Sequence, residues 1–283
     1  MALRIPRPFK RYPRATILLI AIFFFAIWNS FTIRNKLADH VQSYREPRVA
    51  IITLVTDEKS YMHASLKNKD YYARRHKHDF IVDYETHSER SVVWAKFDMI
   101  ERLIKSNKYD WIWWMDFDTL ITNTDIKITD VIRENLKNAT NPGQIDYLLT
   151  HDCNGLNSGS YLVRGHARSL SFIDRVRGWH DVEEVAHNYL SEQDCMAAVL
   201  KQESGYKYYA YKVPQFQLNA FPEEIGCYEG PNGEGKWKVG AFVIHFAGAW
   251  AHVRGDDPTG QLMRKYKDLV VHARGEGGDR VSR

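Results

Sequence analysis

Apolar and polar segments alternate along most of this chain in lengths that are typical of strands and helices. Short runs of apolar, β-branched and aromatic residues, bounded by polar or turn-forming residues, indicate buried strands. The runs predicted as strands are 48–56, 79–85, 109–115, 145–150, 158–164 and 239–248. Helical segments separate several of them, and this alternation predicts an α/β fold with a mostly parallel sheet that helices cover on both faces.

Three segments between the predicted strands have the pattern of helices. In "SVVWAKFDMIERLIKSN", Val93, Phe97, Ile100 and Ile104 recur at helical spacing. The segments "SYMHASLKNKDYYARRHKH" and 191–202 are predicted as helices too. Ligands of such α/β sheets bind beyond the carboxyl ends of the strands. The stretches "DFD" and "HFAG" lie at two such ends, so the functional site is expected at this edge of the sheet.

The N-terminal region has a different pattern. Residues 15–33 carry no charge, and residues 1–14 contain five basic residues and no acidic one. A helix of 19 residues is roughly 28 Å long, so 15–33 is predicted to be a retained transmembrane anchor with a cytosolic N-terminus. A cleaved signal peptide is the alternative interpretation. The polar residues 34–47 are then a short stem, 48–273 a lumenal domain and 274–283 a loose tail.

The net charge argues against one class of partner, and the cysteine content agrees with a lumenal domain. The net charge is only +4 and there is no basic stripe, so nucleic acid is not an expected partner. The cysteines Cys153, Cys195 and Cys227 match no zinc motif in their spacing, and they allow at most one internal disulfide with one thiol left over. The sequon "NAT" at Asn138 is usable only in a lumenal domain, although such short patterns also arise by chance.

The most informative stretch is "YDWIWWMDFDTLITN", in which two aspartates follow a strongly apolar run. Burial of an unpaired carboxylate is costly, so Asp116 and Asp118 are expected to meet a cation or hydrogen-bond donors. In an extended chain these two side chains point the same way, roughly 7 Å apart, with Phe117 packing on the other side. They are therefore candidate ligands of a divalent cation, and caps of a turn are the alternative. His245 is the candidate imidazole ligand, and such a mixed set favours Mn²⁺, with Mg²⁺ as the alternative.

The same stretch also resembles the DxDxT motif of haloacid-dehalogenase-like phosphatases. In that motif the first Asp is a nucleophile and the second an acid or base. Here Thr119 comes one position early, and the motif follows two predicted strands instead of opening the domain. No strong strand leads into "RGDDP" (254–258), which would have to be the late acidic motif. The phosphatase interpretation is therefore disfavoured.

Landmarks along the rest of the chain favour another family. In order, they are "LKNKDYYARRHKHDF", "VWAKFDMIERLI", "YDWIWWMDFDTLITN", "NGLNSGSYLVR", "SEQDCM", "VPQFQLNAFP" and "HFAGAW". With these landmarks, residues 50–250 resemble the fungal α-1,2-galactosyltransferase and α-1,6-mannosyltransferase family, which also contains plant xyloglucan xylosyltransferases. The resemblance implies a type A glycosyltransferase fold in a single-pass type II Golgi membrane protein. It also implies Mn²⁺, retention of anomeric configuration, UDP-galactose or GDP-mannose as donor, and a glycan acceptor that contains mannose.

The resemblance assigns roles to individual residues. Asp116 and Asp118 would hold the metal and the donor diphosphate, and His245 would complete the metal site. Asn68 and Lys69 match positions on the nucleotide side. A lysine that contacts the diphosphate in related folds, a few residues after the histidine, is absent from "HFAGAWAHVRGDD", which offers only a histidine and an arginine in its place.

Other matched positions concern the sugar. Lys96 would neutralise donor phosphate or steady the carboxylates, and an ordinary exposed helix lysine is the alternative. Asp152 and Asn157 match positions that meet the donor sugar and the reaction centre, although Asn157 lies among turn-forming residues. Glu192 and Gln193 match an acidic-Gln pair near the anomeric carbon, and the first turn of a capped helix is the alternative.

Retention allows two mechanisms. A covalent intermediate requires a carboxylate on the face opposite the leaving phosphate, for which Glu192 is the main candidate. In a front-face route, which we favour, the leaving phosphate accepts the proton of the acceptor and Gln193 orients the sugar. The alternative to an active hexosyltransferase is a weakly active or non-catalytic subunit of a Golgi mannan-elongating complex.

Overall fold

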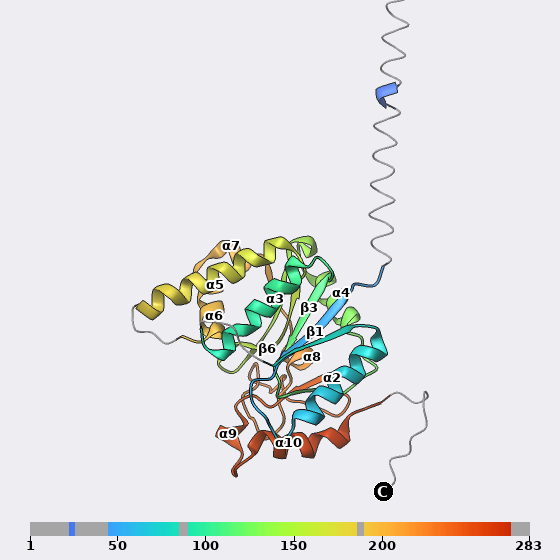
Figure 1. Ribbon diagram of the computed structural model, residues 1–283, viewed down its shortest axis with the longest axis vertical. Coiled ribbons are helices and arrows are strands. Elements are labelled where there is room, and N and C mark those ends of the chain that lie inside the picture. The colour runs from blue at the N-terminus through green and yellow to red at the C-terminus, as the bar shows by residue number, and fades with distance from the viewer. Residues whose placement is uncertain (1–22, 26–44, 85–89, 186–189, 273–283) are drawn as a thin grey trace, which may run out of the picture. The chain divides into compact units, whose positions relative to one another are not determined.

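The computed structural model describes residues 23–25, 45–84, 90–185 and 190–272 (Figure 1). The chain divides into two compact units, Met1–Glu46 and Pro47–Arg283. Within the described residues, no helix is both long and apolar enough to cross a membrane. The predicted anchor at 15–33 lies outside them except for residues 23–25, which are helical, and the predicted tails and most of the stem lie outside them too.

The second unit is built on a six-stranded sheet with the strand order β2-β1-β3-β6-β5-β7 (Figure 1). The strands are β1 (Val49–Leu54), β2 (Asp79–Asp83), β3 (Trp111–Met115), β5 (Tyr147–Asp152), β6 (Gly155–Arg164) and β7 (Ala210–Lys212). β6 runs antiparallel to both of its neighbours, and the other pairs are parallel. The prediction of a mostly parallel sheet is confirmed.

A second sheet has two strands and includes the last strand of the domain, β8 (Val243–His245). β4 (Thr119–Ile121) and β8 pair antiparallel, with Thr119 opposite His245. The strand predicted at 239–248 is therefore shorter than expected, and it is not part of the main sheet. β4 was not predicted, because it has only three residues and follows the aspartates directly.

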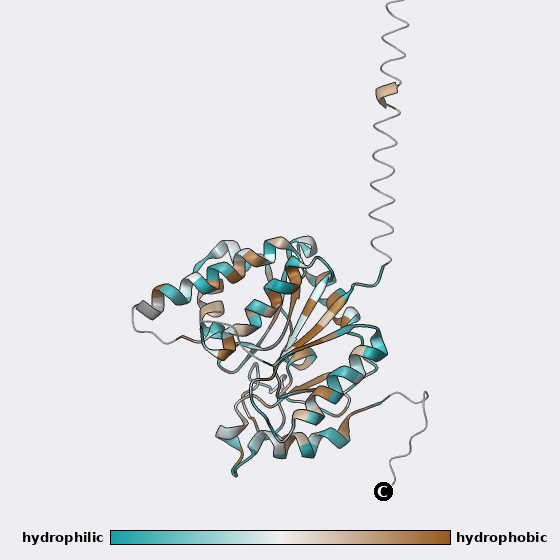
Figure 2. Cartoon of the chain, viewed as in Figure 1, coloured by the Kyte–Doolittle hydropathy of each residue, from teal (hydrophilic) through white to brown (hydrophobic). Residues whose placement is uncertain are grey.

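Helices cover both faces of the main sheet (Figure 1). The helices are α2 (Met62–His76), α3 (Ala95–Lys105), α4 (Ile128–Asn138), α5 (Ala167–Val185), α6 (Glu192–Gln202), α7 (Ser204–Lys207), α8 (Gln215–Leu218), α9 (Ala249–His252) and α10 (Pro258–Tyr266), with short 3₁₀ turns at Val92–Trp94, Pro142–Gln144 and Lys267–Leu269. Side chains alternate along each strand: Ala50 and Ile52 of β1 pack with α3, α5 and α6, whereas Val49 and Ile51 pack with α2 and α4. Figure 2 shows the strands mainly in hydrophobic colours, whereas the helices carry both hydrophobic and hydrophilic colours.

A third apolar cluster joins the small sheet to α9 and α10 through Leu120, Ile244, Ala249, Leu262 and Met263. This cluster fixes the segment that follows β3 against the C-terminal part of the domain. A disulfide between Cys153 and Cys227 ties the β5–β6 turn to the loop after residue 221, and Cys195 is buried in the core. One internal disulfide and one remaining thiol agree with the cysteine prediction.

Candidate active site

The two aspartates lie in the tight turn that joins β3 to β4. The carbonyl of Asp116 accepts hydrogen bonds from the backbone N–H of Thr119 at 3.2 Å and from its hydroxyl at 2.7 Å. The backbone N–H of Asp116 donates to the carbonyl of Gly159 on β6 at 2.7 Å. The expectation of an extended chain was wrong here, but the turn still brings the carboxylates of Asp116 and Asp118 together.

Helix α2 holds this turn from behind. The hydroxyl of Ser65 donates to the carbonyl of Phe117 at 2.6 Å, and the ammonium of Lys69 donates to Ser65 Oγ at 2.7 Å and to the carbonyl of Thr119 at 2.8 Å. These bonds fix the backbone on both sides of Asp118. Lys69 is fully buried, and this burial lowers the pKa of its ammonium to about 7, against the attraction of the two aspartates.

Asn68, one position earlier on α2, clamps the same segment. Its amide nitrogen donates to the carbonyl of Ile121 at 2.9 Å, and its oxygen accepts from the N–H of Ile121 at 2.7 Å. The matched nucleotide-side residues Asn68 and Lys69 are thus both engaged with segment 117–121. The structure places them behind the turn and not on the wall of the cavity described below.

His245 completes a cluster of three possible metal ligands. One ligand atom each from Asp116, Asp118 and His245 lies within 4.8 Å of the other two. The pairing of β4 with β8 sets this arrangement, and Nε2 of His245 lies 3.2 Å from Oδ1 of Asp118. Gly159 makes room for the imidazole, since a Cβ atom there would lie 2.1 Å from Cε1 of His245.

Electrostatics within this cluster favour a cation. Burial raises the pKa of Asp116, and the neighbouring Asp118 charge raises it further, while Lys96 acts in the opposite direction. Burial disfavours the charges of Asp118 and His245, but their mutual attraction and hydrogen bond act together with other nearby groups in the opposite direction, so the pKa of Asp118 is lowered and that of His245 is raised. Two carboxylates and one imidazole form a donor set that suits Mn²⁺, so the residues present fit such an ion. The other group of possible ligands in the described residues includes both cysteines of the disulfide, which excludes it.

A chain of buried amides leads from His245 to the predicted sugar side. Nδ1 of His245 lies 2.8 Å from Oδ1 of Asn219. Nδ2 of Asn219 donates to Oδ1 of Asn157 at 2.8 Å, and Nδ2 of Asn157 donates to Oδ2 of Asp152 at 2.8 Å. Asn219 was not predicted as a site residue, although its polar side chain within "QLNAFP", between apolar residues, was a signal.

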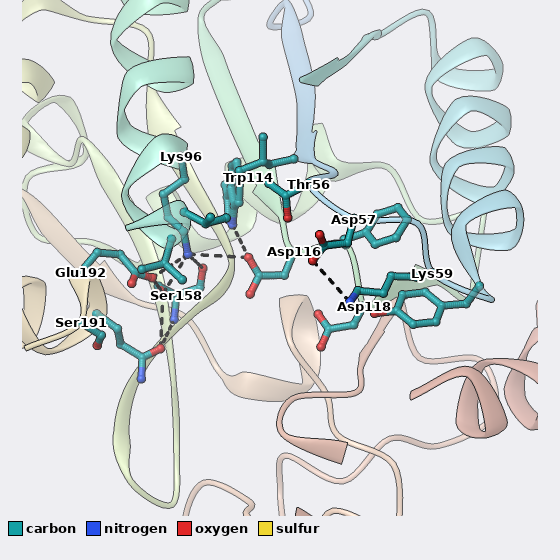
Figure 3. A pocket seen from close by; sticks show the side chains of 16 residues that line it. Thr56, Asp57, Lys59, Lys96, Trp114, Asp116, Asp118, Ser158, Ser191 and Glu192 are labelled. Atoms are coloured by element: carbon teal, nitrogen blue, oxygen red, sulfur yellow. Dashed lines mark hydrogen bonds and ion pairs between the residues drawn. The ribbon is translucent and has the colours of Figure 1, made fainter. Parts of the chain in front are cut away.

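Lys96 links the aspartate turn to helix α6 (Figure 3). Its ammonium lies 2.7 Å from Oε1 of Glu192 and 3.6 Å from Oδ1 of Asp116, and 5.1 Å from the centre of the Trp114 ring. Burial alone would lower the pKa of Lys96, but the two carboxylates raise it above its usual value. The side chain is 3% exposed, so the interpretation as an exposed helix lysine was wrong. The position agrees with a lysine that steadies carboxylates.

Glu192 and Gln193 begin α6 and face Ser158 on β6. The hydroxyl of Ser158 donates to Oε1 of Glu192 at 2.9 Å, and its backbone N–H donates to Oε1 of Gln193 at 2.8 Å. Ser191 and Asp194 form a reciprocal cap at this helix end. The alternative interpretation, the first turn of a capped helix, therefore holds together with the placement of both residues on the cavity.

A cavity of about 570 Å³ opens between these groups (Figure 3). Lys96, both aspartates of the turn, Glu192 and Gln193 lie on its wall together with residues that the sequence analysis did not identify, namely Thr56, Asp57, Lys59, Tyr61, Val92 and Val93. Several of these follow the carboxyl end of β1, where ligands of open α/β sheets bind. Asp152, Asn157 and His245 are not on the wall, but the hydrogen bonds above connect them to it. The exposed His252 and Arg254, the alternatives for a diphosphate contact, are not on it either.

The mostly parallel sheet with paired aspartates at its ligand-binding edge is an α/β architecture that glycosyltransferases share. The chain belongs to the galactosyl transferase GMA12/MNN10 family, whose sequence profile matches residues 45–141 and 133–255. A solved glycosyltransferase involved in the glycosylation of the major capsid of PBCV-1 has a similar fold. The two structures superpose with a TM-score of 0.57 and 15% identity over 77% of this chain and 100% of that one.

Curated relatives in the family come from fungi and plants. Similar proteins are the probable α-1,2-galactosyltransferase gmh2 of Schizosaccharomyces pombe (29% identity over 73% of this chain), the probable α-1,6-mannosyltransferase MNN10 of Saccharomyces cerevisiae (25% over 65%) and the probable xyloglucan 6-xylosyltransferase 5 of Arabidopsis thaliana (29% over 66%). The matches span 64%, 54% and 46% of these three relatives. The match to the family profile establishes membership, and the family resemblance seen in the sequence is confirmed.

Proposed function

We propose that this protein transfers galactose or mannose from a nucleotide sugar to a glycan acceptor in α linkage, with retention of configuration and with a divalent cation, preferably Mn²⁺. The observation that carries the proposal is the convergence of Asp116, Asp118 and His245 beside a cavity whose wall also holds Lys96, Glu192 and Gln193. Relatives named as galactosyl- and mannosyltransferases support the class of sugar.

The aspartate turn and His245 would hold the cation, which when bound acts as a Lewis acid toward the leaving diphosphate. Lys96 stabilises the ionised carboxylates on both of its sides, because its buried ammonium lies between Glu192 and Asp116. The rigid contacts of α2 with the turn keep Asp116 and Asp118 in place before any donor arrives, and such preorganised charges are the largest contribution to many enzymatic rate enhancements.

The contacts of Glu192 support the front-face route. Its Oε1 already accepts from Lys96 and from the Ser158 hydroxyl, and the side chain is only 4% exposed. These bonds withdraw electron density from the carboxylate and weaken it as a nucleophile. Gln193 suits the orienting role, because its oxygen is held by Ser158 and its amide NH₂ has no hydrogen-bond partner within the described residues. A sugar adduct on Glu192, detected by mass spectrometry, would overturn the front-face route.

The activity can be tested with the purified full-length chain. UDP-galactose, GDP-mannose, UDP-glucose and UDP-xylose are each incubated with an α-mannoside acceptor, with and without Mn²⁺, and nucleotide release and the linkage of the product are measured. We expect Mn²⁺-dependent α-linked product from one donor. Asp116→Ala should reduce it by at least about 100-fold, whereas Asp268→Ala, at an exposed carboxylate outside the cavity, serves as the matched control.

Failure with all four donors would contradict the proposal and favour a complex subunit. Asp116→Ala then decides between the two in cells, because a scaffold keeps its partner assembly and its complex function after this change, whereas an enzyme loses its glycan product.

We also propose a Golgi location with the domain in the lumen. The exposed side chain of Asn138, within its sequon at the end of α4, is an accessible reporter of this orientation. A mobility shift on endoglycosidase H treatment that is lost in Asn138→Gln is the expected result. Absence of that shift, together with cytosolic protease accessibility of the domain, would contradict the orientation.

A further inference from the structure

Asn219 occupies the centre of the buried amide chain, and none of its polar atoms reaches solvent, since its exposure is 0%. Its oxygen faces Nδ1 of His245 at 2.8 Å, and its NH₂ group faces Thr150 Oγ1 at 2.9 Å and Asn157 Oδ1 at 2.8 Å. One short side chain thus contacts both the candidate metal ligand and the residue that holds Asp152.

One backbone N–H group fixes which partner donates in each hydrogen bond between Asn157, Asn219 and His245. The N–H of Gly159 can only donate, and it donates to Asn157 at 3.0 Å, so the atom of Asn157 that it meets is the oxygen. That oxygen also faces Asn219, so Asn219 must present its NH₂ group to Asn157. The oxygen of Asn219 is then left for His245, and Nδ1 of the imidazole must carry a hydrogen.

With Nδ1 protonated, the other ring nitrogen faces the carboxylates. Nε2 lies 3.2 Å from Oδ1 of Asp118, so both atoms face the position that a cation held by this cluster would occupy. Metal-bound histidines are oriented in this way by a hydrogen bond from their second nitrogen, and loss of such a partner typically lowers metal affinity about 10–100-fold.

We propose that Asn219 is a positioning residue that presents Nε2 of His245 to the cation and, with its other end, holds the Asn157–Asp152 pair at the sugar side. This inference rests on the proposed metal-dependent transfer. The two ends of Asn219 have separable effects, because only its oxygen serves His245 and only its NH₂ group serves Asn157. A single side chain then couples the metal and the sugar halves of the site.

Two substitutions separate these roles. Asn219→Ala removes both contacts, whereas Asn219→Asp keeps an oxygen for His245 and replaces the donor to Asn157 by a second acceptor. Thr150→Val is the matched control, because it removes the other acceptor of the Asn219 NH₂ group and leaves the bonds to His245 and Asn157 in place. Near-ultraviolet circular dichroism and melting temperature report whether each variant is folded.

Mn²⁺ binding by the full-length chain is measured by electron paramagnetic resonance with UDP or GDP present, and pulsed spectra record the ¹⁴N modulation from the imidazole. We expect Asn219→Ala to weaken Mn²⁺ binding by at least tenfold and to lose the ¹⁴N modulation, as His245→Ala does. Asn219→Asp and Thr150→Val should both bind Mn²⁺ within about threefold of the wild type and keep the modulation. In the assay with donor and acceptor, Asn219→Asp should lower kcat with little change in the Mn²⁺ requirement.

The inference is wrong if folded Asn219→Ala binds Mn²⁺ like the wild type with the ¹⁴N modulation intact, or if Asn219→Asp loses Mn²⁺ as completely as Asn219→Ala. It is also wrong if Asn219→Asp keeps the wild-type kcat. Absence of Mn²⁺ binding in the wild type itself has a different meaning, because it would overturn the metal dependence in the proposed function and the inference with it.

Discussion

Replacement of Lys69 by methionine should stabilise the fold at mildly acidic pH and lose this benefit as the pH rises. Burial lowers the pKa of the Lys69 ammonium from 10.5 to about 7. At roughly 1.4 kcal/mol per pH unit, this difference corresponds to about 5 kcal/mol. Because the folded-state pKa lies below the unfolded one, the penalty is fully present below pH 7 and is relieved between pH 7 and 10.5. At pH 9 about 2 kcal/mol of it remains.

The substitution also removes the bonds of Lys69 to Ser65 Oγ and to the carbonyl of Thr119. A buried carbonyl left without a partner costs about 1–3 kcal/mol. The methionine variant should therefore gain about 2–4 kcal/mol in free energy of unfolding at pH 6 and close to nothing at pH 9. Urea unfolding followed by tryptophan fluorescence at both pH values measures this, with Lys67→Met, an exposed position on the same helix, as control. A variant less stable than the wild type at pH 6, or a gain independent of pH, would refute the reasoning.

Three further predictions concern the supports of the site. Gly159→Ala should abolish transfer and weaken Mn²⁺ binding at least about tenfold, because the new methyl group overlaps the ring of His245; unchanged Mn²⁺ affinity in the resonance titration would contradict this. Lys96→Met should lower the free energy of unfolding by about 3–5 kcal/mol, because it leaves a buried carboxylate unpaired, and a urea midpoint equal to the wild type would argue against it. Cys153→Ser combined with Cys227→Ser should cost up to about 4 kcal/mol, since the crosslink spans 74 residues; calorimetry in which the double variant melts with the oxidised wild type would exclude this.

Much of the main sheet could be predicted because its central strands are buried on both faces. β1 and β3 consist almost entirely of apolar residues, and their runs are visible in the sequence without any periodicity. The direction of β6 was not predicted. The structure shows only residues 153 and 154 between β5 and β6, and a connection this short cannot join parallel strands. The predicted strands end at residue 150 and begin again at residue 158, so the short connection was not recognised.

The candidate metal ligands could be recognised from their local sequence, but the contacts that position them depend on long-range packing. Asp116 and Asp118 stood out because carboxylates after an apolar strand require a partner. The space for His245 depends on a glycine of β6, and the orientation of its ring depends on Asn219. Both contacts join segments far apart in the chain, so a local pattern can mark Asn219 as a buried polar residue but cannot show that it meets His245.

The pairing of β4 with β8 has a consequence for biosynthesis. Thr119 lies opposite His245, so the proposed metal site draws on two segments that leave the ribosome far apart in time. A nascent chain that ends before β8 contains the aspartate turn but lacks the imidazole and the strand that supports it. Contacts between distant segments also tend to form late in folding. Truncated and partly folded chains are therefore expected to be catalytically silent, so that the proposed sugar transfer would start only when the domain is complete.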